Sequence, residues 1–269
     1  MFGPNISVKH ITVPIAGIPD ALAGLRLAHV SDFHFRKWGE VYIHAQEALS
    51  ALKPDLLLLT GDYAVNPHRW QRPLEMLCRF LEPIAQDTPI CGVMGNHDHP
   101  DMLAHGRIPA VFLRNESITR EHNGIPYEVV GVDQHHFGGE NIRAALGDAR
   151  ERALTLLLAH YPSTVFRLPP GRVDLQLSGH THGGQIRFPF FGCVWPNDKI
   201  SCRMARGLHA VGGTLLHVTP GIGVSNPLPV RFRCPPEISV LTLQAAITKK
   251  RPKTKRTQAE VNVDSSPIP

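Results

Sequence analysis

The stretch VDLQLSGHTHGG, residues 173–184, joins a short apolar run to two histidines that stand one residue apart. The run VDLQL is typical of a buried strand, and the two glycines at the far end favour a turn. Side chains at positions i and i+2 point to the same face of an extended segment, so His180 and His182 could converge on one bound object. The alternative is that both are solvated turn residues, and the rest of the chain has to decide.

An apolar run followed by a polar side chain recurs at four other places in the chain. The four are LRLAHVS before Asp32-Phe33-His34, DLLLLT before Gly61-Asp62, PICGVM before Gly95-Asn96-His97-Asp98, and LTLLLA before His160. Sites in open α/β sheets form beyond the carboxyl ends of strands. A helix cap, a left-handed turn or a core histidine explains each residue alone. Together these explanations require five coincidences at corresponding places, which favours a common site.

The apolar runs alternate with segments of helical period, which predicts an α/β protein with buried sheets. Residues 41–53 carry apolar side chains at helical spacing and end at Lys53-Pro54. Further helices are expected over 68–86 and 140–150. The runs short enough to be strands lie at 25–30, 55–60, 89–94, 127–132, 154–160, 173–179, 214–221 and 238–243. Strands outnumber helices in the second half, so we expect two packed sheets in one domain, residues 1–247.

The clustered polar side chains are all of types that bind metal ions. Three carboxylate or amide oxygens and four imidazoles are too many ligands for one ion, but they suit two ions that share a carboxylate. No cysteine lies in these motifs, which argues against a structural zinc site. The mixture of nitrogen and oxygen ligands favours Mn, Fe, Zn or Co over Mg or Ca. Two such ions can activate a water molecule and bind phosphoryl oxygens.

The basic character of the chain is concentrated at its end. The net charge is +5, and residues 248–269 hold six Lys or Arg and two acids, which leaves +1 for residues 1–247. The tail lacks aromatic residues and apolar periodicity, as is typical of a disordered segment. We expect it to be a solubilising end or a weak attachment to an anionic membrane surface. The near-neutral body argues against nucleic acid as a partner.

Cysteine use and hydropathy predict a cytoplasmic protein, free or peripheral to the inner membrane. No run of eighteen apolar residues is present, and the first residues lack the pattern of a secretory signal. The number of cysteines is odd and none form a C-x-x-C pair, which predicts free thiols in a reducing compartment. The five are Cys78, Cys91, Cys193, Cys202 and Cys234.

The blocks D-F-H, G-D, G-N-H-D, a lone H and G-H-T-H, in this order, resemble the calcineurin-like metallophosphoesterases over roughly residues 23–245. The strings SGHTHGGQIRFPF and PLPVRFRCPPEISVLTL are similar to a bacterial subgroup with the phosphodiesterases YkuE and YaeI and a UDP-2,3-diacylglucosamine hydrolase. The resemblance implies a four-layer αββα sandwich of two mixed sheets flanked by helices. It also implies a hydrolase that cleaves a phosphodiester or pyrophosphate bond by attack of a metal-bound hydroxide, with Mn as the metal of choice in vitro.

The same resemblance implies a role for each polar residue of the five blocks. The ligands would be Asp32, His34 and His182 for one ion, Asn96, His160 and His180 for the other, and Asp62 for both. His97 would contact the phosphate and protonate the leaving oxygen or stabilise its charge. Asp98 would orient His97 by a hydrogen bond. The glycines beside His180 and His182 would let the backbone approach the metals and the phosphate.

The chain departs from the family pattern at two places. Tyr161 follows the lone histidine where members usually carry Asn, and Pro220 stands where they often carry an arginine before G-x-G. The second departure leaves the substrate preference open. A nuclease and an inactive scaffold are the alternatives to a phosphodiesterase. A scaffold would be expected to lose ligands, whereas here all seven ligand positions and His97 are filled.

The stretch RFPFFGCVWP, residues 187–196, crowds five large apolar side chains directly after the two histidines. One interpretation is that they pack in the core. The other is an apolar wall beside the metals that suits an acyl chain or a membrane surface. On this second hypothesis Phe190 and Trp195 bind a lipid-linked phosphoester such as UDP-2,3-diacylglucosamine, and Arg187 pairs with its phosphate.

Overall fold

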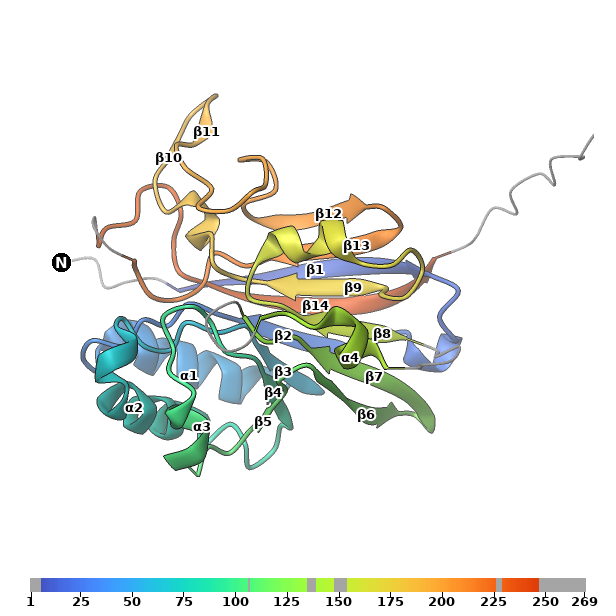
Figure 1. The fold of residues 1–269 in the computed structure, drawn as a ribbon, viewed down its shortest axis with the longest axis horizontal. Helices are drawn as coiled ribbons and strands as arrows, with labels where there is room; N and C mark the ends of the chain where they lie inside the picture. Colours follow the sequence, from blue (N-terminus) through green and yellow to red (C-terminus); the bar gives the residue numbers. More distant parts are fainter. Residues whose placement is uncertain (1–5, 106, 135–138, 148–153, 226–228, 247–269) are drawn as a thin grey trace, which may run out of the picture.

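Two six-stranded mixed sheets form the centre of the molecule (Figure 1). The computed structural model describes residues 6–105, 107–134, 139–147, 154–225 and 229–246. The predicted tail, 248–269, and the end of the helix predicted over 140–150 lie outside these residues.

The first sheet has the order β1-β14-β2-β3-β4-β5. Its strands are β1 (Ser7–Ala16), β14 (Glu237–Ala246), β2 (Arg26–Val30), β3 (Leu56–Leu59), β4 (Ile90–Gly92) and β5 (Val111–Phe112). Strands β2 to β5 are parallel to one another, and β14 runs antiparallel to β2. The parallel arrangement brings the carboxyl ends of β2, β3 and β4 to one edge of the sheet.

The second sheet has the order β12-β13-β9-β8-β7-β6. Its strands are β12 (Gly207–Val211), β13 (Thr214–Val218), β9 (Leu175–Ser178), β8 (Thr155–Leu158), β7 (Ile125–Gly131) and β6 (Glu116–His122). Strands β13, β9, β8 and β7 are parallel, and β12 and β6 close the two edges in the antiparallel direction. The carboxyl ends of β8 and β9 therefore lie side by side, as those of β2 and β3 do.

The alternation of side chains along the strands explains why the sheets stack. On β3, Leu57 and Leu59 pack with the helices, while Leu56 and Leu58 face the second sheet. The core between the sheets takes side chains from both of them, for example Leu27 of the first and Leu177 of the second. A strand buried on both faces reads as an unbroken apolar run, which is the pattern that DLLLLT shows.

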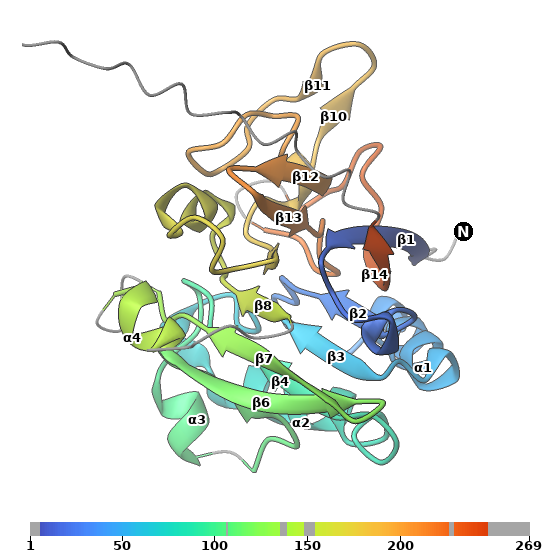
Figure 2. The same ribbon diagram turned by 90° about the vertical axis from the view of Figure 1, so that its right-hand side faces the viewer.

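Helices cover the outer faces and complete four layers, so the predicted αββα sandwich is confirmed. Helices α1 (Glu40–Leu52) and α2 (Gln71–Leu81) pack on the first sheet, and Figures 1 and 2 show them on the same side of it. Helix α4 (Ile142–Leu146) and the 3-10 helix Pro162–Arg167 cover the second sheet. The chain also forms helix α3 (Asp101–His105) and the hairpin β10 (Arg187–Phe188) with β11 (Gly192–Cys193). Among the described residues, no helix is both long and apolar enough to cross a membrane.

Three strands of five or more residues are not predicted from the sequence, because no stretch of them is continuously buried. Strands β1, β6 and β12 lie at sheet edges. The side chains of β1 and β6 alternate between more and less exposed positions over most of their length, and β12 has no buried side chain. Such half-covered strands lack the continuous apolar run by which the central strands were found.

The prediction of five free thiols is wrong for two cysteines. Cys193 and Cys202 form a disulfide, whereas Cys78, Cys91 and Cys234 are free. The chain turns back within nine residues and brings the two Cα atoms to 5.5 Å. That distance suits a disulfide, and no C-x-x-C spacing is required when a loop rather than a single turn joins the pair.

Candidate dinuclear metal site

The polar residues predicted from the five sequence blocks gather where the strand ends of the two sheets meet. The backbone N–H of Asp32, after β2, donates to the carbonyl of Gly61, after β3, at 2.9 Å. The backbone N–H of His180, after β9, donates to the Asp32 carboxylate, with 3.0 Å to Oδ2. The second bond crosses from one sheet to the other. The loops after the strands are thus tied together by their own backbone groups before any ligand is considered.

One group of candidate metal ligands comprises Asp32, His34 and His182, all buried. The Nε2 atoms of the two histidines are 3.1 Å apart, and Oδ1 of Asp32 lies 3.5 Å from Nε2 of His182. These distances are short enough for one ion to contact all three atoms. The set is the one that the resemblance implies for the first ion.

The second group comprises Asp62, His160 and His180, also buried. Nε2 of His160 lies 3.2 Å from Nδ1 of His180 and 3.1 Å from Oδ1 of Asn96. Asn96 therefore presents an amide oxygen at the same point as the two imidazoles. The structure brings all seven predicted ligands together.

Asp62 lies between the two groups. Its Oδ2 is 3.5 Å from Nε2 of His34 and 3.4 Å from Nε2 of His160, one histidine from each group. Its Oδ1 accepts the backbone N–H of His97 at 2.8 Å. One oxygen is thus fixed by the protein, and the other faces both groups, as a bridging carboxylate requires.

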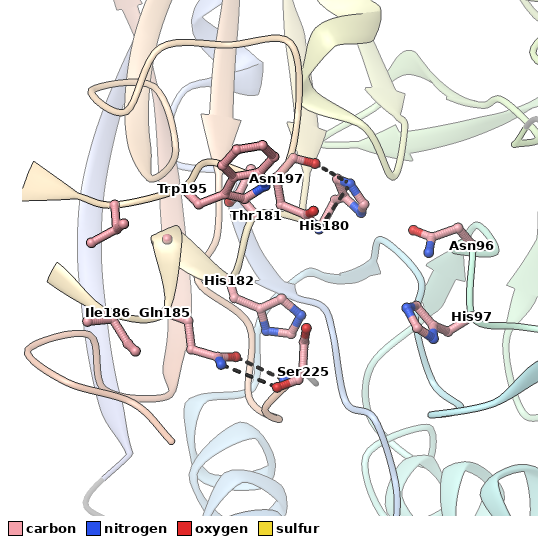
Figure 3. A pocket seen from close by; sticks show the side chains of 12 residues that line it. Asn96, His97, His180, Thr181, His182, Gln185, Ile186, Trp195, Asn197 and Ser225 are labelled. Carbon is pink, nitrogen blue, oxygen red and sulfur yellow. Dashed lines mark hydrogen bonds between the residues drawn. The ribbon is translucent and has the colours of Figure 1, made fainter. Parts of the chain in front are cut away.

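Hydrogen bonds to the outer nitrogens fix the tautomers of three ligand histidines. Nδ1 of His34 donates to the carbonyl of Ala64 at 3.1 Å, and Nδ1 of His160 donates to that of Thr60 at 2.6 Å. Nε2 of His180 donates to the carbonyl of Asn197 at 2.7 Å (Figure 3). The inner nitrogen of each ring then carries an unprotonated lone pair, which is the usual arrangement around a bound metal.

The second group of candidate ligands favours a positive charge at its centre. When both imidazoles are neutral, each atom that meets there is an acceptor, since His160 and His180 have used their protons on outer carbonyls. Burial would lower the pKa of His160, but the Asp62 carboxylate raises it to about 9. A positive charge is therefore favoured at this point, and a divalent ion supplies it for all the acceptors at once. The residues present fit a pair of such ions.

The pKa values of the other histidines favour the form that binds metals. Burial lowers the pKa of His34 and of His180 to about 4, and it holds that of His182 well below its usual range. These rings are neutral at pH 7, and the neutral imidazole is the ligand. Burial would raise the pKa of Asp62, but His160 and His34 hold it well below its usual range, so Asp62 is anionic.

Five ligand residues adopt left-handed backbone conformations that are unfavourable for side chains other than glycine. Their φ angles are +54° for Asp32, +45° for His34, +56° for Asp62, +65° for His180 and +51° for His182. Each costs roughly 1 kcal/mol or more. Strain of this kind persists only where the surrounding structure holds it, and it is characteristic of functional sites.

Glycines, among them Gly179 beside His180, allow the loops of the candidate ligands to approach one another. A Cβ on Gly95 would collide with Oδ1 of Asp62, and one on Gly179 would collide with Oδ2 of Asp32. Gly183 and Gly184 instead face Cys234 and Cys193. Gly184 also lines the cavity beside the ligand groups. That the glycines after His182 let the backbone approach metals and phosphate therefore stays a prediction.

His97 projects toward the cavity, as predicted, but its support comes from a different residue. Nδ1 of His97 donates to the carbonyl of Val65 at 2.8 Å, and its ring lies edge-on to that of His34 with centroids 5.0 Å apart. The bond to Val65 leaves Nε2 as the nitrogen that can meet a substrate. Figure 3 shows His97 and Asn96 on the side of the pocket opposite Trp195 and Asn197.

The prediction that Asp98 orients His97 is wrong. Oδ2 of Asp98 accepts the backbone N–H groups of Asp62 and Gly95 at 2.8 and 2.7 Å. Oδ1 accepts those of Tyr63 and Ala64 at 2.7 and 3.0 Å. The carboxylate is buried and uses both oxygens on backbone donors. Asp98 therefore fixes the loop that carries Asp62.

A cavity of about 560 Å³ opens beside the two ligand groups. Asn96, His97, His180 and His182 line it, and Val194 and Trp195 line it from the segment after the β10–β11 hairpin. Gln185 and Ser225 also line the cavity and are joined by two backbone–side chain bonds of 3.3 and 2.9 Å (Figure 3). The cavity thus combines ligand atoms on one side with an apolar surface on the other.

The apolar residues after His182 do not pack in the core. Phe190 and Phe191 are exposed, and Trp195 is 71% exposed. Of the three residues predicted to bind substrate, Trp195 lines the cavity, whereas Phe190 and Arg187 do not. The Arg187 guanidinium donates to the carbonyl of Gly183 at 2.8 Å, so the structure gives no support to its pairing with phosphate.

Residues that act through their backbone carbonyls could not be predicted from the sequence. Asn197, Thr60, Ala64 and Val65 hold ligand histidines or His97 in this way, and no residue type is required for such a contact. The side chain of Arg231 was missed as well. It donates to the carbonyls of Pro220 and Gly223 at 2.8 and 2.9 Å and braces the loop in which the family's usual arginine is absent.

Replacing Asp98 tests whether its carboxylate fixes the loop of Asp62. In Asp98→Asn, an NH₂ group would face two backbone N–H donors. We therefore expect the free energy of unfolding to fall by about 2–4 kcal/mol. Metal content should fall as well. Denaturant unfolding and elemental analysis measure these effects. The control is Asp101→Asn, an exposed carboxylate outside both ligand groups, and equal stability of the two variants would contradict the assignment.

Comparison with known proteins agrees with the site geometry. A sequence model of the family described as calcineurin-like phosphoesterase matches residues 25–184. The chain is 28% identical to the uncharacterized metallophosphoesterase YkuE of Bacillus subtilis, over 89% of this chain and 86% of YkuE. It is 29% identical to the phosphodiesterase YaeI of Escherichia coli, over 85% and 86% of the respective chains.

Two further similarities are more distant. The UDP-2,3-diacylglucosamine pyrophosphatase LpxG of Chlamydia trachomatis is 24% identical over 82% of this chain and 84% of its own. The crystal structure of a 5'-nucleotidase precursor from Thermus thermophilus is similar in fold, with a TM-score of 0.52 and 13% identity over 81% of this chain and 54% of that one. Since the family model covers more than half of the sequence and both ligand groups are in place, the protein belongs to the calcineurin-like phosphoesterases and is a phosphoric ester hydrolase.

Proposed function

We propose that this protein hydrolyses a phosphodiester or pyrophosphate bond with two divalent metal ions, one at each ligand group. The position of Asp62 carries the proposal, because a single carboxylate oxygen lies 3.5 Å from His34 and 3.4 Å from His160. A structural site for one ion would not need an anion between two sets of ligands. When bound, two such ions lower the pKa of a water molecule and stabilise negative charge on phosphoryl oxygens.

The protein's own contribution is to hold the ligand atoms in place and to supply a proton. Backbone carbonyls orient the imidazoles of His34, His160 and His180, so little rearrangement is needed when substrate binds. His97 reaches the cavity with Nε2, at a place where it can protonate the leaving oxygen or stabilise its charge. The mixed imidazole and carboxylate ligands favour Mn, Fe, Zn or Co.

We propose further that the substrate is linked to a lipid. Val194 and Trp195 form an exposed apolar wall of the cavity, which suits an acyl chain next to the scissile phosphate. LpxG, a relative at low identity, is named as a pyrophosphatase of UDP-2,3-diacylglucosamine, a substrate of this chemical type. A phosphodiester without a lipid is the alternative, and the same site would hydrolyse it.

Removal of the shared carboxylate tests the dinuclear assignment. Asp62→Ala should abolish hydrolysis of an aryl phosphodiester and lower the metal content, because two cations would lose their common anion and repel each other. Asp87→Ala, at an exposed surface position, is the matched control. Turnover close to that of the wild type, with two metals still bound per chain, would contradict the proposal.

Replacement of His97 separates proton donation from metal binding. His97→Ala should retain both metals and lose on the order of 10²–10⁴-fold in kcat, the usual scale for a positioned acid. The loss should be smaller for substrates with good leaving groups, since these need less protonation. His68→Ala is a control at an exposed histidine. A variant that loses metal and is slowed equally on each substrate would instead identify His97 as a ligand.

Replacement of Trp195 tests the lipid-linked substrate. Trp195→Ser should raise KM for a diacylated nucleotide-sugar substrate several-fold, while kcat/KM for a small aryl phosphodiester stays near the wild-type value. Phe166→Ser, an exposed aromatic residue away from the cavity, is the control. If the wild type turns over the aryl phosphodiester but no lipid-linked substrate, the lipid hypothesis fails and the phosphodiesterase assignment stands.

A further inference from the structure

Exposed apolar side chains are concentrated on one part of the surface. Of the eleven large hydrophobic residues that are exposed in the described part of the chain, seven lie in or beside the β10–β11 hairpin. We call these seven the hairpin patch: Phe188, Phe190, Phe191, Val194, Trp195, Val230 and Phe232. Single exposed hydrophobic residues are common on proteins, but a contiguous group marks an interaction surface.

The two segments of the hairpin patch are joined in space. The backbone N–H of Arg187 donates to the carbonyl of Phe232 at 3.0 Å, and the N–H of Phe232 donates to that of Gln185 at 3.0 Å. The rings of Phe188 and Phe232 lie 5.9 Å apart. Figures 1 and 2 both show the β10–β11 hairpin projecting from the body of the molecule, so an extended surface could reach its tip without meeting the sheets.

Phe190 at the tip is unfavourable for this chain in isolation. Its side chain is fully exposed, and its φ of +69° is a left-handed conformation that a bulky residue rarely adopts. Exposure forfeits the free energy of burial, and the backbone conformation adds strain. Contact with an apolar medium outside the protein would recover the free energy of burial and offset the backbone strain.

The charge around the hairpin patch favours an anionic partner. Residues 186–233 hold six Lys or Arg and one acid, which gives a net charge of +5. Residues 1–247 together carry +1, so the part of this range outside 186–233 carries −4. Lys199, Arg203 and Arg233 are exposed. The acid, Asp198, is occupied by the backbone N–H groups of Ser163 and Lys199. Positive charge thus predominates in the segments that carry the hairpin patch.

We propose that the hairpin patch docks on the surface of an anionic phospholipid bilayer. Phe190 and Phe191 enter the interface between headgroups and acyl chains, and Lys199, Arg203 and Arg233 face the lipid phosphates. A combination of apolar insertion and basic residues is what reversible membrane attachment needs. This docking surface lies in the folded domain and is separate from the basic tail.

Docking would place the cavity at the membrane. Val194 and Trp195 belong to the patch and also line the cavity, so a lipid-linked phosphoester could pass from the bilayer to the ligand groups without crossing water. This part of the inference rests on the proposed function. The docking itself does not, and it can be measured in the absence of any substrate.

Flotation with lipid vesicles tests the docking. The full chain is mixed with vesicles of phosphatidylglycerol and phosphatidylcholine, or of phosphatidylcholine alone, and the floated fraction is measured at two salt concentrations. We expect binding to the anionic vesicles that weakens with salt. The variant Phe190→Ser/Phe191→Ser should bind on the order of tenfold more weakly, because two apolar insertions are lost. Phe166→Ser, an exposed aromatic residue outside the patch, should bind as the wild type does.

The possible outcomes are distinct. No flotation of the wild type overturns the proposal, and a change of oligomeric state in the double variant would then assign the patch to a protein interface. Equal binding of the wild type and the double variant also overturns it and assigns attachment to another part of the chain. Thermal unfolding of the variants checks that both are folded. Hydrolysis of a soluble aryl phosphodiester by the wild type, measured in the same samples, tests the proposed function separately.

Discussion

The position of Asp62 between the two groups of candidate ligands is the constraint on which the rest of the site depends. Its Oδ2 must face a histidine from each group, and its Oδ1 is held by the N–H of His97. The loop that carries Asp62 is in turn held by the four backbone donors that Asp98 accepts. A buried anion placed so accurately needs cations beside it, because burial without them would favour the protonated form. Metal binding and loop geometry are therefore two aspects of one arrangement.

The double-sheet architecture makes this arrangement possible. Strands β2, β3 and β4 supply four of the seven predicted ligands, and β8 and β9 supply the other three. Neither sheet alone has enough strand ends to hold two ions with separate ligand sets. Stacking the sheets through the leucines between them brings both sets of ends together. The left-handed backbone of five ligand residues is the cost, and the fully packed core on either side supplies the stability that maintains it.

The surface beside the site differs in character from the site itself. The ligand groups are buried, polar and closely held, while the hairpin next to them exposes aromatic side chains amid basic residues. The disulfide between Cys193 and Cys202 closes the loop that contains Trp195 and Asn197. This loop contains both Trp195, which forms an apolar wall of the cavity, and the Asn197 carbonyl that orients His180.

The sequence by itself determined the central strands, helices α1 and α2, and the residues that gather at the candidate site. Continuous apolar runs identify strands buried on both faces, and polar residues directly after them identify the site, because both signals are local. The sequence was less informative for the edge strands β1, β6 and β12, because none of them forms a continuous buried run.

Tertiary structure decided the contacts made by the ligands' neighbours. Asp98 stands next to His97 in the chain, yet its carboxylate serves the loop of Asp62, and the carbonyl of Val65 serves His97. The pairing of Cys193 with Cys202 and the exposure of Phe190 likewise depend on the tertiary structure. Residue types state which bonds a side chain can make, but the choice of partner depends on which backbone donors and acceptors the packed sheets bring within about 3 Å.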